Sequence, residues 1–126
     1  MDLDSFIKEN RITMSATEAA DNPGWTGDPN DRHFKVVLHY KRRQMTTYFS
    51  MGPAHTEWPR TAQVLRCLAD DSARIENTPD FDDWEDEMGY FRGAWAAWKQ
   101  SRMNARKLKN LLGDELYDKL LWGDTE

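Results

Sequence analysis

The chain has 126 residues, of which 39% are hydrophobic and 31% are charged, and its formal net charge is -5 at pH 7. This length fits one domain, residues 1–126, with a single core, and six Trp, five Phe and four Tyr argue against disorder throughout. No apolar run reaches the roughly 18–20 residues that cross a bilayer, and one cysteine, Cys67, excludes an internal disulfide. We therefore expect a cytosolic protein without a membrane partner, in which Cys67 is a small buried residue.

The N-terminal segment predicts a short helix, a strand and a loop. Asp4 can cap a helix that ends near Asn10. From Arg11 to Ala16 the apolar residues alternate, which is typical of a half-buried strand. Residues 21–31 combine Asn, Pro, Gly and Asp around Trp25, so they predict a loop that this aromatic residue either holds in place or offers to a partner.

Residues 33–51 predict a β-hairpin. Phe34, Val36, Leu38 and Tyr40 share one face of the first strand, and the second strand repeats the alternation from Met45 to Met51. A two-residue loop at Arg42 and Arg43 would pair Tyr40 with Met45, and a four-residue loop would keep the same parity. Either loop places three basic residues at the hairpin tip, namely Lys41, Arg42 and Arg43. Such a tip is either a solvated turn or a contact for phosphate or for an acidic partner.

Two helices follow the hairpin. The first begins near Pro59 or Thr61 and places Leu65, Leu68 and Ser72 on a face that covers the sheet. Thr78 caps the second helix, which is strongly acidic. Its carboxylates are Asp80, Asp82, Asp83, Glu85, Asp86 and Glu87. These acids either complement the helix dipole and aid solubility or form a docking surface.

The longest predicted helix runs from about Tyr90 to Leu112 and is basic on one side. Helical spacing puts its basic residues within an arc of about 100°, together with one aromatic residue. The arc consists of Arg92, Trp95, Lys99, Arg102, Arg106 and Lys109. Interleaved aromatic and basic residues are typical of single-strand nucleic-acid binders, although an amphipathic helix also needs a solvated face. A final helix is capped by Asp114.

Together these elements predict an α+β fold. We expect a small antiparallel sheet of about three strands from the N-terminal half, covered by three to five helices that come mostly from the C-terminal half. No motif for catalysis, phosphate cradling or metal ligation is present, because none of the three histidines has an HxH or HExxH partner. We therefore expect no enzymatic activity, no catalytic residues, no metal site and no cofactor.

Several segments resemble a family of small, uncharacterised accessory proteins encoded by tailed bacteriophages. The similar segments cover most of the chain and include YFSMGPAHT from Tyr48, VLRCLADD from Val64, FDDW from Phe81 and KLKNLLGDELYDKLLW from Lys107. The resemblance implies a location in the cytoplasm of an infected bacterial host. It supplies no enzymatic activity and no catalytic residues.

The leading hypothesis is a phage protein that inhibits a host defence complex. Its six acids at residues 80–87 would imitate a row of phosphates and occupy a basic channel of a CRISPR effector or a restriction enzyme. The alternative is a nucleic-acid-binding accessory factor that uses the basic arc and the hairpin tip, although the net charge weighs against it. A homodimer that pairs the acidic segment of one copy with the basic helix of another remains open.

Overall fold

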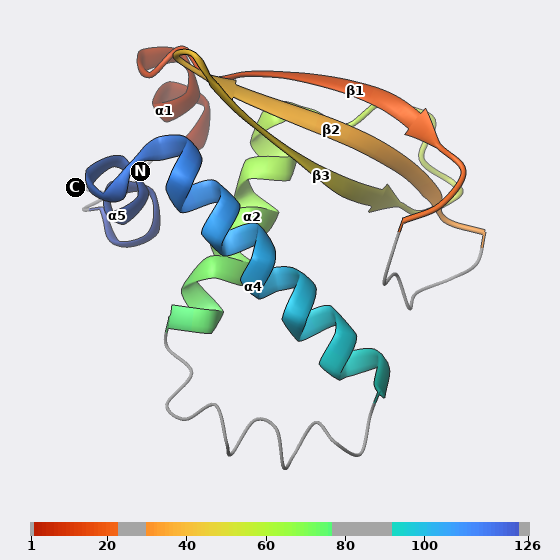
Figure 1. The fold of residues 1–126 in the computed structure, drawn as a ribbon. Helices are drawn as coiled ribbons and strands as arrows, with labels where there is room; N and C mark the ends of the chain where they lie inside the picture. The colour runs from red at the N-terminus through yellow and green to blue at the C-terminus, as the bar shows by residue number, and fades with distance from the viewer. Residues whose placement is uncertain (1, 23–29, 77–91, 124–126) are drawn as a thin grey trace.

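The computed structural model describes residues 2–22, 30–76 and 92–123. For residues 92–98 it describes the backbone alone. The chain forms an antiparallel sheet and four helices within these ranges, which confirms the predicted α+β class (Figure 1). In chain order the elements are α1 (Leu3–Glu9), β1 (Thr13–Ala19), β2 (Arg32–Tyr40), β3 (Arg43–Met51), α2 (Thr61–Glu76), α4 (Arg92–Leu112) and α5 (Asp114–Trp122). No helix among the described residues is long and apolar enough to cross a membrane.

The three strands lie in the order β1–β2–β3, and both pairs are antiparallel. The predicted hairpin is correct in its faces but wrong in its register. Lys41 and Arg42 form the loop, so Tyr40 pairs with Arg43 and Leu38 pairs with Met45. The turn fits one residue earlier because Lys41 adopts a φ of 56° there. A shift of two positions preserves every face, since side chains alternate with a period of two.

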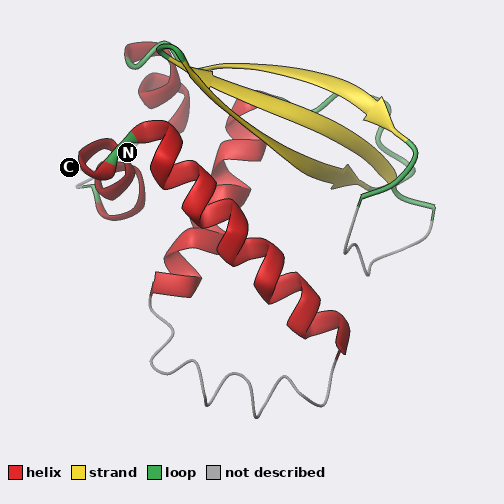
Figure 2. Ribbon diagram, viewed as in Figure 1, coloured by secondary structure: helices red, strands yellow, loops and turns green. Residues whose placement is uncertain are grey.

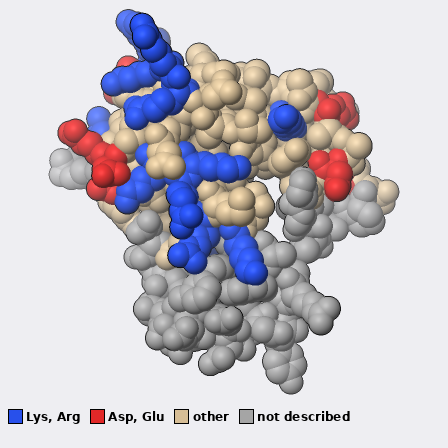
Figure 3. All heavy atoms as spheres, viewed as in Figure 1, with Lys and Arg blue, Asp and Glu red and all other residues tan. Residues whose placement is uncertain are grey.

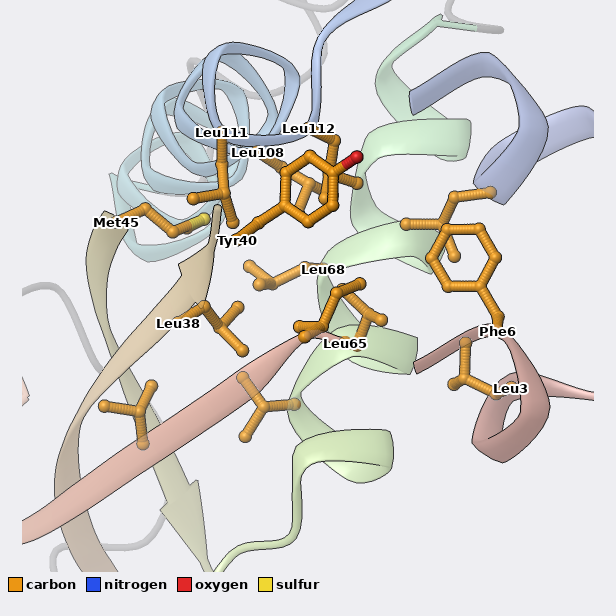
Figure 4. Close-up of a cluster of buried hydrophobic side chains, with 14 of the residues drawn as sticks. Leu3, Phe6, Leu38, Tyr40, Met45, Leu65, Leu68, Leu108, Leu111 and Leu112 are labelled. Carbon is orange, nitrogen blue, oxygen red and sulfur yellow. The ribbon is translucent and has the colours of Figure 1, made fainter. Parts of the chain in front are cut away.

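Helices α2 and α4 cover one face of the sheet and build the core with it (Figure 2). The sheet contributes Phe34, Val36 and Leu38, which are fully buried. The helices contribute Leu65 and Leu108, which are equally buried, and Figure 4 shows leucines of both helices directed at the strands. The opposite face of β2 carries Lys35, Val37 and His39, which are exposed or half-buried, as the alternation predicts.

Helix ends differ from the sequence-based expectations in two places. Asp2 rather than Asp4 caps α1, and its carboxylate accepts a hydrogen bond from the Asp4 amide at 3.2 Å. Gly113 rather than Asp114 is the N-cap of α5, with a φ of 84° that suits glycine. Asp114 instead lies in the first turn of α5, where the helix dipole favours a carboxylate.

One further expectation is wrong, and two others concern residues that the structure does not describe. Cys67 lies on the exposed side of α2, so the prediction that it is buried is wrong. The sequence could not reveal this because Cys67 flanks the apolar stripe of α2 and the neighbouring helices leave that flank open. The acidic helix predicted from Thr78 and the loop aromatic Trp25 both lie outside the described residues.

Candidate functional site

The β2–β3 turn presents three exposed cations, Lys41, Arg42 and Arg43. Two of these cations lie close to the same aromatic ring, that of Tyr40. The Lys41 ammonium lies 5.3 Å from the centre of the Tyr40 ring, and the Arg43 guanidinium lies 5.6 Å from it. These distances are within the range of cation–π attraction. Since Tyr40 is only 9% exposed, the hairpin tip is anchored to the core beside it.

The basic arc of α4 faces away from the core, as predicted. Lys99, Arg102, Arg106 and Lys109 are all exposed, whereas Leu108 on the opposite side is fully buried. The Lys109 ammonium lies 5.7 Å from the centre of the Tyr117 ring of α5. Arg92 begins the described part of α4. The structure describes only the backbone of Arg92 and Trp95.

A groove between β3 and α4 brings the hairpin and the long helix together. It has a volume of about 570 Å³ and is lined by residues 43–46 of β3 and by Lys107, Asn110 and Leu111 of α4. We call this hollow the β3–α4 groove. The Lys107 ammonium donates a hydrogen bond to the backbone oxygen of Thr46 at 3.1 Å, across 61 residues of sequence. Arg43 and Lys107 therefore contribute two positive charges to one concave surface.

The β3–α4 groove belongs to a larger basic surface. Figure 3 shows Lys and Arg gathered over α4 and over the hairpin tip, with Asp and Glu at α5 and at the far end of the sheet. Six of the 22 Asp and Glu stand together at residues 80–87. The rest of the chain therefore carries a formal charge of +1, although the whole chain carries -5.

Of the seven described residues that line this groove, sequence reasoning identified only Arg43 as a candidate site residue. Lys107 lies outside the basic arc of α4, because a helical projection places it about 60° from the edge of that arc. Gln44 and Asn110 carry no charge and belong to no motif, yet both are exposed and line the groove. A projection of α4 identifies its exposed side, but it cannot identify which flank of that side lies beside β3.

The cysteine and histidine side chains do not form a second candidate site. Cys67 is exposed on α2, but partial desolvation raises the pKa of its thiol, and the nearby charges of Asp71 and Asp70 add to this effect. The thiol is therefore protonated at neutral pH and is a weak nucleophile. His33 is nearly buried, and its Nδ1 lies 2.7 Å from the Ser50 hydroxyl in a polar contact between β2 and β3. Among the described residues, no three His, Cys, Asp or Glu side chains converge in a way that could hold a metal ion.

The six acids of the leading hypothesis, at residues 80–87, lie outside the described residues. Comparisons with known proteins add no family, since no family model matches the chain and no curated protein or solved structure is significantly similar to it. The candidate site therefore rests on the charges and shape of the β3–α4 groove and its surroundings.

Proposed function

We propose that this protein is a non-enzymatic, nucleic-acid-binding accessory factor that holds the phosphate backbone at the β3–α4 groove. The observation that carries the proposal is the meeting of the hairpin tip and α4, two basic segments far apart in sequence, at one concave surface. A positively charged groove that follows the backbone is the common feature of proteins that bind nucleic acid without strong sequence preference.

The charge distribution supports this proposal more than the net charge of the chain does. Nine of the 17 Lys and Arg lie on α4 or at the hairpin tip, and the residues outside 80–87 carry a formal charge of +1. A local positive field attracts a polyanion even when the whole molecule is acidic, because screening limits each interaction to roughly 8 Å at physiological salt.

Binding of labelled single-stranded RNA and DNA, followed by fluorescence anisotropy at several salt concentrations, tests the proposal. We expect affinity that falls as salt rises, with a slope that weakens by about 0.7 for each phosphate contact removed. The Arg43→Gln/Lys107→Gln variant should show this loss. Lys8→Gln and Lys35→Gln change exposed lysines on α1 and on the outer face of β2, so they are the matched controls. Binding that ignores salt, or equal losses in both sets, would contradict the proposal.

A second candidate is the inhibitor of a host defence complex, most plausibly a CRISPR effector, which is favoured by the six acids at residues 80–87. Carboxylates along a helix can imitate a phosphate row and be steered to a basic channel. In this proposal the phage protein acts in the bacterial cytoplasm and its partner is a protein complex. Inhibition measured with purified effector should disappear when all six acids are replaced by Asn or Gln, and undiminished inhibition would reject this candidate.

A further inference from the structure

We propose that the β3–α4 groove is a subsite for one unpaired nucleotide of a single strand. This inference rests on the proposed nucleic-acid binding and specifies the form of nucleic acid that the groove accepts. Its volume of about 570 Å³ falls within the roughly 300–1,000 Å³ of small-molecule clefts. The floor, the walls and the rim of the groove each offer a different contact to a nucleotide.

The floor of the groove is apolar. Met45 and Leu111 close its bottom and are only 5% and 2% exposed, so most of the apolar surface that a ligand could touch comes from the aliphatic stems of Arg43 and Lys107 beside them. Figure 4 shows both side chains at the contact between β3 and α4. A nucleobase that leaves its stack is held by apolar groups against its faces.

The walls of the groove carry two amides. Gln44 stands on β3 and Asn110 stands on α4, and both side chains are exposed. Each amide offers two N–H donors and one acceptor oxygen, which are the groups that recognise the edge of a base. A base resting on the floor of the groove would therefore meet a hydrogen-bonding partner on either side.

The rim of the groove carries positive charges that can bind the phosphates of a nucleic-acid backbone. Lys107 uses one of its three ammonium protons on the Thr46 oxygen, which fixes the ammonium and leaves two protons for a phosphate. Arg43 lies opposite, on β3. Lys41 and Arg42 extend this charge beyond the groove on the hairpin side, and Arg106 extends it along α4. Cations on both sides suit a continuing strand rather than a single free nucleotide.

Duplex bases cannot use this site, since they remain paired and stacked and their faces are not available to the floor. The test therefore compares one sequence in two forms. Anisotropy is measured for a labelled oligonucleotide of about 12 nucleotides, a length that single-strand sites commonly span. It is measured free and annealed to its complement, for RNA and for DNA, with wild type and with Gln44→Ala/Asn110→Ala. Melting of each variant confirms that it folds, and a nucleoside monophosphate serves as competitor.

We expect wild type to favour the single strand over the duplex by about tenfold, and the double variant to lose that preference while keeping its salt-dependent affinity for duplex. Equal binding of both forms by wild type, or an unchanged preference in the double variant, would overturn the subsite and leave the proposed function standing. Displacement of the strand by an equal nucleotide concentration of the monophosphate would also overturn it. A lack of binding to either form would instead refute the proposed function itself.

Discussion

Arg11 occupies a position that usually belongs to glycine. It has a φ of 54° and follows α1 directly. Its amide donates to the Lys8 oxygen at 3.2 Å, and the Ile12 amide donates to the Ile7 oxygen at 3.0 Å. This pair of hydrogen bonds is the Schellman arrangement, in which the left-handed residue is most often glycine.

Replacing Arg11 by glycine should therefore stabilise the fold. The left-handed conformation costs an L-residue about 1–2 kcal/mol, and the added freedom of glycine in the unfolded chain offsets roughly 0.5–1 kcal/mol of the gain. We expect Arg11→Gly to raise the free energy of unfolding, measured with urea, by about 0.5–1 kcal/mol. Arg11→Val is the matched control and should lower it, because a β-branched residue suits this conformation poorly. A destabilised Arg11→Gly variant would contradict the assignment.

Asp71 gives a residue-scale test of pH dependence. Burial raises the pKa of its carboxyl above the ordinary value of 3.8, although Arg74 and a hydrogen bond with Ser101 oppose the shift. A raised native pKa means that the folded state holds the proton more tightly than the unfolded chain. The resulting stabilisation is complete below pH 3.8 and is lost as the pH rises through the native pKa.

The Asp71→Asn variant stays neutral at every pH. Its stability relative to wild type should therefore increase as the pH rises from below 3.8 through the native pKa, and should then level off. Urea unfolding of both proteins between pH 3.5 and 7 measures this difference, and other titrating groups cancel in it to first order. A difference that stays constant across this range, or falls, would show that the Asp71 pKa is not raised.

At the scale of elements, one buried hydrogen bond ties β3 to α4 beside the groove. The Thr47 hydroxyl donates to the Asn104 side-chain oxygen at 3.0 Å, and the two residues are only 3% and 8% exposed. Removing one partner leaves the other buried without its bond. Removing both with apolar groups of similar shape avoids that penalty.

We expect Asn104→Ala to lower the free energy of unfolding by about 1–3 kcal/mol, since it leaves the buried Thr47 hydroxyl without its hydrogen-bond acceptor. The double variant Thr47→Val/Asn104→Leu should recover most of that loss. Thermal and urea unfolding of the two variants measure the effect. If the double variant were no more stable than the single one, the hydrogen bond would not be the source of the loss.

The elements also show how far sequence reasoning extends. Alternation identified the buried faces of β1, β2 and β3, and helical spacing identified the exposed side of α4, because both periods follow from the backbone alone. Alternation did not predict the hairpin register, since Lys41 adopts a left-handed conformation that its residue type does not indicate. Lys107 and Asn110 escaped sequence reasoning because their role depends on the strand beside them. Cys67 escaped it because the neighbouring helices decide its exposure.

At the scale of the whole molecule, charge is divided between parts of the chain. Six acids stand together at residues 80–87, and the rest of the chain carries a formal charge of +1. Replacing those six acids by Asn and Gln changes the formal net charge from -5 to +1. This single variant separates the two candidate functions, because each predicts an opposite consequence of removing the acids.

If the β3–α4 groove binds nucleic acid, the neutralised variant should bind a labelled single strand more tightly than wild type at low salt, since repulsion of the phosphates is reduced. The gain should shrink as salt screens the charges. If the acids dock onto a host complex, the same variant should lose inhibition instead. Fluorescence anisotropy and an effector cleavage assay on one preparation measure both, with circular dichroism confirming the fold. An unchanged affinity at low salt would contradict the first expectation.

The most direct test of the central claim is the salt dependence of single-strand binding by wild type and by Arg43→Gln/Lys107→Gln. The claim predicts a linear fall of log affinity with log salt for wild type and a slope shallower by about 1.4 in the variant, because two phosphate contacts are removed at about 0.7 each. The Lys8→Gln/Lys35→Gln control should keep the wild-type slope. Identical slopes for all three proteins, or no measurable binding by wild type, would contradict a nucleic-acid site at the β3–α4 groove.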